Sequence, residues 1–362
     1  MNDSPHEGTH SSPSYASSLA RSQALAKDLT VHPEHYRILT GDRPTGRLHI
    51  GHYFGTLENR VVLQNRGVPL FVLIADYQAL TDRDASSTLP NDVLEILADY
   101  LACGINPEQA TIFCHSHVPA LNQLMLPFLS LVTVSEISRN PTVKDEIQSS
   151  GRDYVTGMMF TYPVHQAADI LSMHGTVVPV GKDQLPHLEI TRTIARRFNE
   201  RYSPDAPYFI EPTGLLGNAP LLLGVDGEKM SKSRHNAIQI ASTADETARL
   251  IKGAKTDPDR HITYDPKHRK EVSNLILLAS LCLGTTPEHV ASQVGDGGSS
   301  SLKALVTDAV NTYFQPIREH RATLLADPSH LISILREGNE RACDVADATL
   351  RDVQRLMFTK YY

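Results

Sequence analysis

The chain has 362 residues, of which 41% are hydrophobic and 21% are charged, and its formal net charge is −7. The length allows one large domain and a smaller one, and the acidic balance argues against a protein that coats DNA or other nucleic acid. No apolar run approaches the roughly 18 residues that span a bilayer, and four scattered cysteines without a Cys-x-x-Cys pair favour a reducing cytoplasm over a disulfide or zinc framework.

Residues 1–33 are rich in Ser and His and lack an apolar signal core, so we expect them to form a disordered N-terminal extension. A short apolar run at 36–39 then predicts a strand, and a helix-like stretch covers 54–64. Between them lies the turn Gly-Asp-Arg-Pro-Thr-Gly-Arg-Leu-His-Ile-Gly-His-Tyr. A strand, a glycine-rich turn and a helix start together form a setting in which backbone groups contact phosphates.

Three glycines of this turn, Gly41, Gly46 and Gly51, can take a positive φ and let a ligand come close. His49 and His52 are three residues apart, so both should face one side of the first helical turn. Two imidazoles there could stabilise the charge that develops during displacement at phosphorus. The alternative is an ordinary turn with two incidental histidines.

The next elements alternate between strand and helix. Residues 70–75 form a continuous apolar run typical of a buried parallel strand, 91–104 have helical spacing, and 110–115 predict another strand. This alternation predicts an α/β fold with a Rossmann-type doubly wound parallel sheet over residues 34–235, with an insertion around 119–156. The ligand crevice of such a sheet lies at the carboxyl ends of its strands.

A helix predicted over 157–173 places Tyr162, Gln166 and Asp169 on one face. A carboxylate on so apolar a helix is costly without a partner, which makes Asp169 a candidate for ligand recognition; a structural cap or buried hydrogen bond is the alternative. A strand over 176–180 leads into Gly181-Lys182-Asp183-Gln184, where Asp183 and Gln184 could bind ribose hydroxyls or an amine.

The loop Gly227-Glu228-Lys229-Met230-Ser231-Lys232-Ser233 carries two lysines that could clamp a polyphosphate leaving group. From 236 to 362 the pattern is helical and indicates a bundle without a second sheet.

Two short motifs bring a family resemblance. His49-Ile50-Gly51-His52 and the stretch Lys229 to Ser233 match, letter for letter, the two signatures of the class I aminoacyl-tRNA synthetases. Within that class the compact members for tyrosine and tryptophan are similar to each other. The stretches 41–46, 75–81, 162–171 and 178–199 resemble the tryptophan enzymes.

The resemblance implies an enzyme that activates L-tryptophan with ATP and transfers it to tRNA(Trp), with region 236–362 as an anticodon-binding domain and a homodimer as the assembly. Magnesium would arrive with ATP, and no metal bound by the protein itself is expected. Asp169 would accept the indole N–H, Tyr162 and Gln184 would hold the α-amino group, and Gln78 and Gln166 would complete the tryptophan pocket. The implied catalytic residues are His49, His52, Lys229 and Lys232. The implied ATP site comprises Arg43, Pro44, Thr45, Gly51, His52, Gly181, Lys182, Asp183, Leu221, Lys229, Met230, Ser231, Lys232 and Ser233.

Two positions depart from the commonest bacterial tryptophan enzymes, which carry His at the place of Gln78 and Met at the place of Gln166. Gln166 instead fits the Tyr-x-x-x-Gln-x-x-Asp helix of the tyrosine enzymes. The chain thus resembles a divergent second bacterial type that tolerates tryptophan-mimicking inhibitors. A tyrosine enzyme, a small nucleotidyltransferase that shares the His-x-Gly-His turn and a noncatalytic RNA-binding relative are the alternatives.

Overall fold

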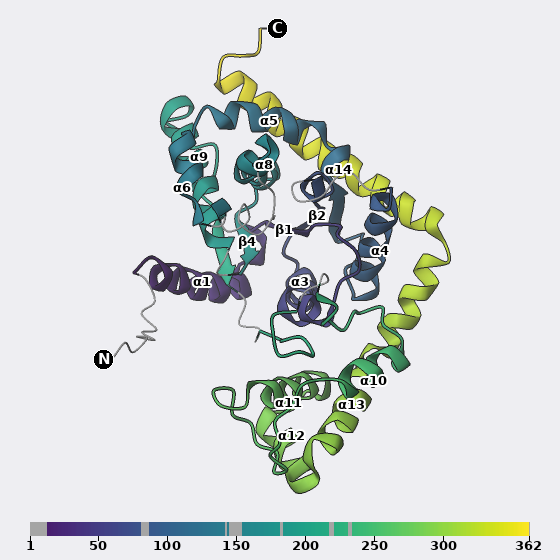
Figure 1. Ribbon diagram of the computed structural model, residues 1–362. Helices are drawn as coiled ribbons and strands as arrows, with labels where there is room; N and C mark the ends of the chain where they lie inside the picture. The colour runs from purple at the N-terminus through teal and green to yellow at the C-terminus, as the bar shows by residue number, and fades with distance from the viewer. Residues whose placement is uncertain are drawn as a thin grey trace, which may run out of the picture.

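The computed structural model describes residues 13–80, 87–141, 143–144, 154–181, 184–216, 221–230 and 234–361. A parallel sheet lies inside the upper part of the molecule, with helices on both of its faces (Figure 1). A group of helices from the C-terminal third lies below, and the last helix runs back up along the edge of the sheet.

The sheet has five parallel strands in the order β3-β2-β1-β4-β5. They span Ile38–Asp42 (β1), Leu70–Ile74 (β2), Ala110–Cys114 (β3), Val177–Val180 (β4) and Thr213–Leu216 (β5). The strand order reverses between β1 and β4, where Ile38 pairs with Leu70 on one side and with Val177 on the other. A sheet of this order opens a ligand crevice at that switch point, and the predicted doubly wound α/β fold is confirmed.

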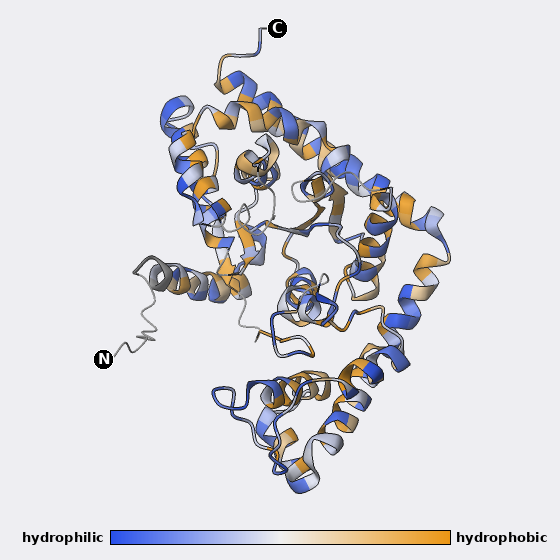
Figure 2. Ribbon diagram, in the orientation of Figure 1, coloured by the Kyte–Doolittle hydropathy of each residue, from blue (hydrophilic) through white to orange (hydrophobic). Residues whose placement is uncertain are grey.

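Alternating strand residues build a core on each face of the sheet. Ile38, Val72 and Ile112 belong to one core, and Leu39 and Phe71 belong to the other. Hydrophobic residues predominate in β2, β3 and β4, whereas the helices that cover the sheet are mixed (Figure 2). The first core is covered by α3 (Glu58–Asn65) and α4 (Leu89–Ala102). The second is covered by α5 (Pro119–Leu129), α6 (Val134–Arg139), α8 (Gly157–Ser172) and α9 (Leu185–Tyr202).

Short elements connect these layers. They are a single helical turn α2 (Ile50–His52), a π-helical turn (Tyr53–Leu57), and 3₁₀ turns η1 (Pro33–His35), η3 (Tyr77–Leu80), η4 (His115–His117) and η7 (Gly295–Gly297).

The predicted C-terminal region is helical: α10 (Ala244–Lys252), α11 (Lys270–Leu283), α12 (Pro287–Val294), α13 (Gly298–Leu325) and α14 (Pro328–Leu356). α13 packs on α4, so the first core continues into this region. α14 lies against β3, where a Cβ on Gly338 would come within 1.8 Å of the Ile112 carbonyl oxygen. The Cys114 N–H also donates to Asn339 Oδ1 at 2.9 Å. α14 therefore covers the edge strand, which would otherwise present unpaired backbone groups. The division into domains at residue 235 stays a prediction.

Within the described ranges no single helix is long and apolar enough to cross a membrane. One pair bent by 110°, α11 with the α12–α13 segment, meets the criteria by length and composition only.

The expected disorder of residues 1–33 is wrong for its second half. Pro13–Val31 form helix α1, which packs on β5. Leu25 and Leu29 are buried, and the buried Ser22 hydroxyl accepts the Leu216 N–H at 2.8 Å. The average composition of the segment concealed one buried stripe at positions 22, 25 and 29, which share a helix face. Residues 1–12 lie outside the described part of the chain.

Candidate active site

A cavity of about 740 Å³ lies at the switch point of the sheet. Its walls come from the ends of β1 and β4, the turn at 41–52, helix α8 and the segment 221–230. Almost all described candidate residues line it: Arg43, Thr45, His49, Gly51, His52, Gln78, Tyr162, Gln166, Asp169, Gly181, Gln184, Leu221, Lys229 and Met230. Among the described candidates only Pro44, which is buried beside Arg43, does not.

The two histidines of the first motif face the same side, as their spacing predicted. His49 is the N-cap of α2, and the His52 N–H donates to His49 Nδ1 at 3.3 Å. In return the His49 N–H donates to His52 Nδ1 at 3.2 Å. The imidazole rings stack with their centroids 3.6 Å apart. This reciprocal capping box fixes both rings at the start of a helix, where backbone N–H groups favour an anion.

The segment that follows the second motif pairs with the first motif through its backbone. The Ile50 N–H donates to the Ile238 carbonyl at 3.0 Å, and the Ile240 N–H donates to the Leu48 carbonyl at 3.0 Å. Met230 also packs on the turn, because a Cβ on Gly51 would lie 3.1 Å from its Sδ. Lys229, which forms an isolated bridge with Leu223, lines the cavity beside Met230. Ser231, Lys232 and Ser233 lie outside the described residues.

Of the three glycines expected to take a positive φ, only Gly46 does so, at 101°. The role of Gly51 is different: a Cβ there would lie 3.0 Å from His49 Nδ1. Glycine at this position therefore allows the two signature motifs and the His49 ring to come close.

A buried ion pair between Asp42 and Arg60 supports the turn at 41–52. Asp42, at the end of β1, accepts hydrogen bonds from Arg60 Nη1 and from the Tyr100 hydroxyl, both at 2.7 Å. Burial alone would raise the pKa of Asp42, but the charge and hydrogen bond of Arg60 outweigh burial and hold that pKa well below its usual range. The carboxylate thus remains charged and fixes the end of β1. The sequence reading missed these three residues because they are far apart along the chain.

Helix α8 forms the wall expected to recognise the amino acid. Tyr162 and Asp169 are buried and Gln166 is half-buried, and all three line the cavity. The predicted shared face is therefore confirmed. Buried His187, which sequence reasoning did not select, links this wall to the nucleotide turn: its Nδ1 lies 2.7 Å from the Tyr162 hydroxyl and 3.3 Å from Gln184 Oε1.

A second cavity of about 280 Å³ adjoins this wall and shares Gln78 and Tyr162 with the first. The rest of its lining comes from α5 and α8: Asn122, Met125, Met158, Thr161 and His165. Gln78 and Tyr162 thus stand between the large cavity and this second one.

Asp169 has a close neighbour that sequence reasoning also missed. Nε2 of the fully buried His115 lies 2.9 Å from Asp169 Oδ1. The His115 ring lies 4.5 Å from the ring of His165, whose Nε2 contacts Asn122 Oδ1 at 3.1 Å. Burial lowers the pKa of His165. The only available signal was the position of His115 directly after a buried strand.

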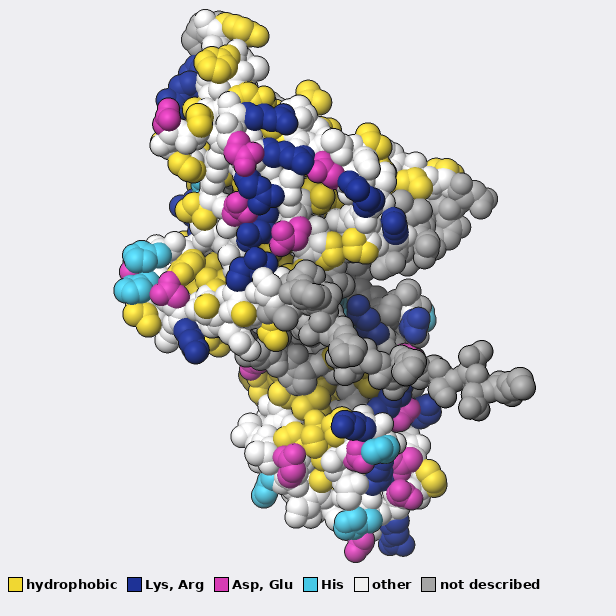
Figure 3. Space-filling view, turned by 90° about the vertical axis from the view of Figure 1, so that its left-hand side faces the viewer, with side chains coloured by type: hydrophobic (Ala, Val, Ile, Leu, Met, Phe, Trp, Pro, Cys, Tyr) yellow, Lys and Arg dark blue, Asp and Glu magenta, His cyan; other side chains and the backbone are white. Residues whose placement is uncertain are grey.

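The turn after β4 contributes Gly181 and Gln184 to the cavity, whereas Lys182 and Asp183 lie outside the described residues. Beyond it, the arginines of α9 are paired with carboxylates. Arg192 and Arg196 both contact Glu211, at 3.1 and 3.4 Å, and Arg197 contacts Glu136 at 2.6 Å. The face of the molecule in Figure 3 accordingly mixes basic and acidic side chains.

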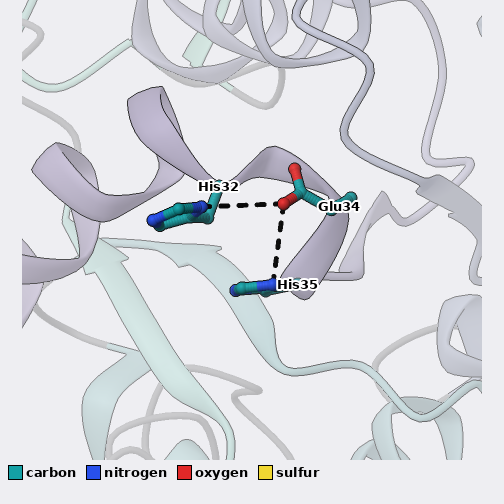
Figure 4. Close-up of side chains that lie close together, drawn as sticks. All are labelled: His32, Glu34 and His35. Atoms are coloured by element: carbon teal, nitrogen blue, oxygen red, sulfur yellow. Dashed lines mark ion pairs between the residues drawn. The ribbon is translucent and has the colours of Figure 1, made fainter.

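Two groups of described side chains have ligand atoms close enough to hold a metal ion. One is the buried set His115, His165 and Asp169. The other is the exposed set His32, Glu34 and His35 at the end of α1, where Glu34 Oε1 lies 3.6 Å from His32 Nδ1 and 3.5 Å from His35 Nε2 (Figure 4). The exposed set does not line the large cavity.

The chain is similar to known proteins over most of its length. Residues 32–315 match the family model of the class I tRNA synthetases (W and Y). The chain is 41% identical to a tryptophan–tRNA ligase of Clostridium longisporum over 90% of this chain and 97% of that one. It is 38% identical to the ligase of Streptococcus pyogenes serotype M1, over 90% and 98%. The tryptophanyl-tRNA synthetase of Campylobacter jejuni, solved with ADP and tryptophan, is 31% identical, with a TM-score of 0.79 over 89% of this chain and 99% of that one.

The chain therefore belongs to the class I aminoacyl-tRNA synthetases, whose members use ATP. Within that class it belongs with the tryptophan–tRNA ligases.

Proposed function

We propose that this cavity activates L-tryptophan with ATP, forming tryptophanyl-AMP and pyrophosphate, and then transfers tryptophan to tRNA(Trp). The observation that carries the proposal is that one cavity is lined by His49, Gly51 and His52 of the first motif, by Lys229 and Met230 of the second, and by the buried Asp169. The motifs provide a site for phosphates, and the carboxylate provides an acceptor for a ring N–H.

In the activation step the tryptophan carboxylate attacks the α-phosphorus and pyrophosphate leaves. The protein contributes position and charge rather than a covalent group. Stacked His49 and His52 would face the phosphates, while Arg43 and Lys229, which also line the cavity, would supply positive charge. Lys232, from the same motif as Lys229, would join them.

The amino acid would lie against α8. Asp169 accepts the indole N–H, and the linked pair Tyr162 and Gln184 binds the α-ammonium group. Tyr162 is well placed because His187 orients its hydroxyl. Gly181 and Asp183 would bind the ribose. Magnesium would enter bound to ATP, coordinated mainly by phosphate oxygens.

The assembly we propose is a homodimer. Its support in this chain is a set of exposed apolar side chains in the insertion region, Leu126, Val134 and Tyr154, which are 74%, 71% and 63% exposed. Exposed large apolar side chains in one region of a chain are a feature of interaction surfaces when they lie together. Light scattering of the purified chain tests this: a mass near twice 39.9 kDa is expected, and 39.9 kDa would overturn the proposal.

Amino-acid-dependent ATP–pyrophosphate exchange tests the function directly, with tryptophan and tyrosine measured side by side. We expect exchange with tryptophan and a loss of about 100-fold or more in kcat/KM for Asp169→Asn, since this removes a charged acceptor from a buried site. Exchange with tyrosine would instead indicate a tyrosine pocket, in which Gln166 takes the role that it has in the tyrosine enzymes. Exchange with neither, in the presence of matching tRNA, would overturn the catalytic proposal.

A further inference from the structure

Asp169 is a carboxylate almost without access to solvent, 1% exposed. Its Oδ1 has no hydrogen bond of ordinary geometry among the described residues. A buried carboxylate that lacks a donor is costly, and in practice it takes up a proton or turns toward a partner. A carboxylate without a fixed donor is therefore a poorly oriented acceptor for a ring N–H.

A nitrogen that can donate lies close by: Nε2 of His115 is 2.9 Å from Asp169 Oδ1. This is the length of a charge-assisted hydrogen bond, but the two groups are not aligned for one. His115 is 0% exposed, and neither ring nitrogen has an aligned partner in the described part of the chain. Two buried polar groups with unmet hydrogen-bonding capacity thus face each other.

The surroundings fix the His115 ring. It directly follows β3 and begins η4, so the sheet sets its backbone. Its ring is nearly parallel to that of Tyr77, with centroids 6.4 Å apart, and packs against His165. His165 contacts Asn122 through its own Nε2. These neighbours leave Asp169 as the nearby acceptor for His115.

We propose that His115 is a positioning residue for tryptophan selection. It donates from Nε2 to Asp169 Oδ1, fixes the orientation of the carboxylate and leaves Oδ2 directed to the indole N–H. The pair comes into line when the substrate N–H draws the carboxylate toward the cavity. This inference rests on the proposed function, and His115 itself touches no substrate.

The predicted signature is selectivity for the ring N–H. A site built around a buried acceptor rejects an analogue that lacks the donor, because the acceptor is then left unpaired. The suitable analogue is 3-(benzothiophen-3-yl)alanine, in which sulfur replaces the N–H at nearly the same shape. Without His115 the carboxylate is no longer held in place as an acceptor, so this discrimination should fall.

The experiment measures pyrophosphate exchange for His115→Phe, which keeps a flat ring but cannot donate, and His115→Gln, which keeps a donor. For His115→Phe we expect KM for tryptophan to rise about 10- to 100-fold. KM for ATP should stay within about twofold, and the preference for tryptophan over the benzothiophene analogue should fall at least about tenfold. His115→Gln should restore most of both.

His174→Asn is the matched control, because His174 is a half-buried histidine beyond the end of α8 with a φ of 50°, which Asn tolerates. It should leave all three quantities unchanged. The contact itself is tested in the Asp169→Asn background, where His115→Phe should add little, since the acceptor is already gone.

Three results would overturn the inference. They are an unchanged KM for tryptophan and unchanged selectivity in His115→Phe, equal losses for ATP and tryptophan in both His115 variants, and effects of His115 and Asp169 that simply multiply. Wild-type exchange with tryptophan separates these failures from a failure of the proposed function. If His115→Phe does not fold, ring ¹⁵N spectra of the wild type, assigned with His115→Gln, decide the point: the His115 signal must shift with tryptophan and not with the analogue.

Discussion

Arg321 offers the sharpest test of how the helical region is joined to the catalytic core. From α13 it forms ion pairs with two carboxylates of α4, Glu95 and Asp99, and its Nε lies 2.6 Å from Asp99 Oδ1. The Asp99 side chain is fully buried, and its other oxygen accepts the Leu48 N–H at 2.8 Å. Leu48 directly precedes His49, so one network connects α13 to the first signature motif.

Replacing Arg321 by Met removes the positive charge but keeps much of the side-chain volume. Breaking a buried ion pair from one side costs about 3–5 kcal/mol, because the other charge is left uncompensated. With about 2.1 cal/mol/K of unfolding entropy per residue over 362 residues, this corresponds to a fall in Tm of about 4–7 °C. Burial already raises the pKa of Asp99, so the deficit should grow as the pH rises above about 4, where the carboxyl groups must ionise.

Calorimetry at pH 5 and pH 8 measures both effects, with kinetics of pyrophosphate exchange alongside. KM for ATP should rise by about two- to fivefold, which corresponds to a loss of about 0.5–1 kcal/mol in the hydrogen bond from the Leu48 N–H to Asp99. The triple variant Arg321→Met, Glu95→Gln, Asp99→Asn should recover part of the stability, since no buried charge remains. A single variant as stable as the wild type, or a triple variant no better than the single one, would refute the reasoning.

Three further predictions concern other parts of the chain. The Arg197 hydrogen bond lowers the pKa of Glu136 to about 2. The stabilisation of the fold by this pair is complete above pH about 4.5 and is lost as the pH falls toward 2. The unfolding free energy of Arg197→Gln, measured by urea titration, should lack this pH dependence. Leu29→Ala should cost about 2–5 kcal/mol in unfolding free energy by denaturant titration, because Leu29 is buried on the inner face of α1; a cost below about 0.5 kcal/mol would show that α1 is only loosely held. Gln78→His with Gln166→Met should increase inhibition of exchange by a tryptophan-mimicking inhibitor, and unchanged inhibition would rule out these two residues as the source of tolerance.

Much of the fold could be predicted because its signals are local. The strands β1 to β4 are short apolar runs bounded by glycine or charge, and the spacing of Tyr162, Gln166 and Asp169 alone placed them on one helix face. Both signature motifs were contiguous strings of residues. Their joining at one cavity followed from the switch-point rule for doubly wound sheets.

What sequence could not provide is pairing between distant segments. α1 became a helix because Ser22 and Leu29 find partners on β5 and in the core, and composition averaged over 33 residues concealed them. Likewise α14 returns to cover β3 because Gly338 permits close contact, a role that no single glycine reveals in advance.

The same inability to foresee contacts between distant segments explains which pocket residues the sequence did not reveal. The described residues assigned from motifs line the cavity, with Pro44 as the exception, whereas His115 and His187 stand one layer behind them and act through Asp169 and Tyr162. Arg60 lines the cavity itself and acts through Asp42. Such supporting residues come from whichever strand end or helix happens to pass nearby, so no fixed spacing marks them. Because the facing residues depend on them for orientation and charge, differences in selectivity between similar enzymes can arise in this second layer while both signatures stay intact.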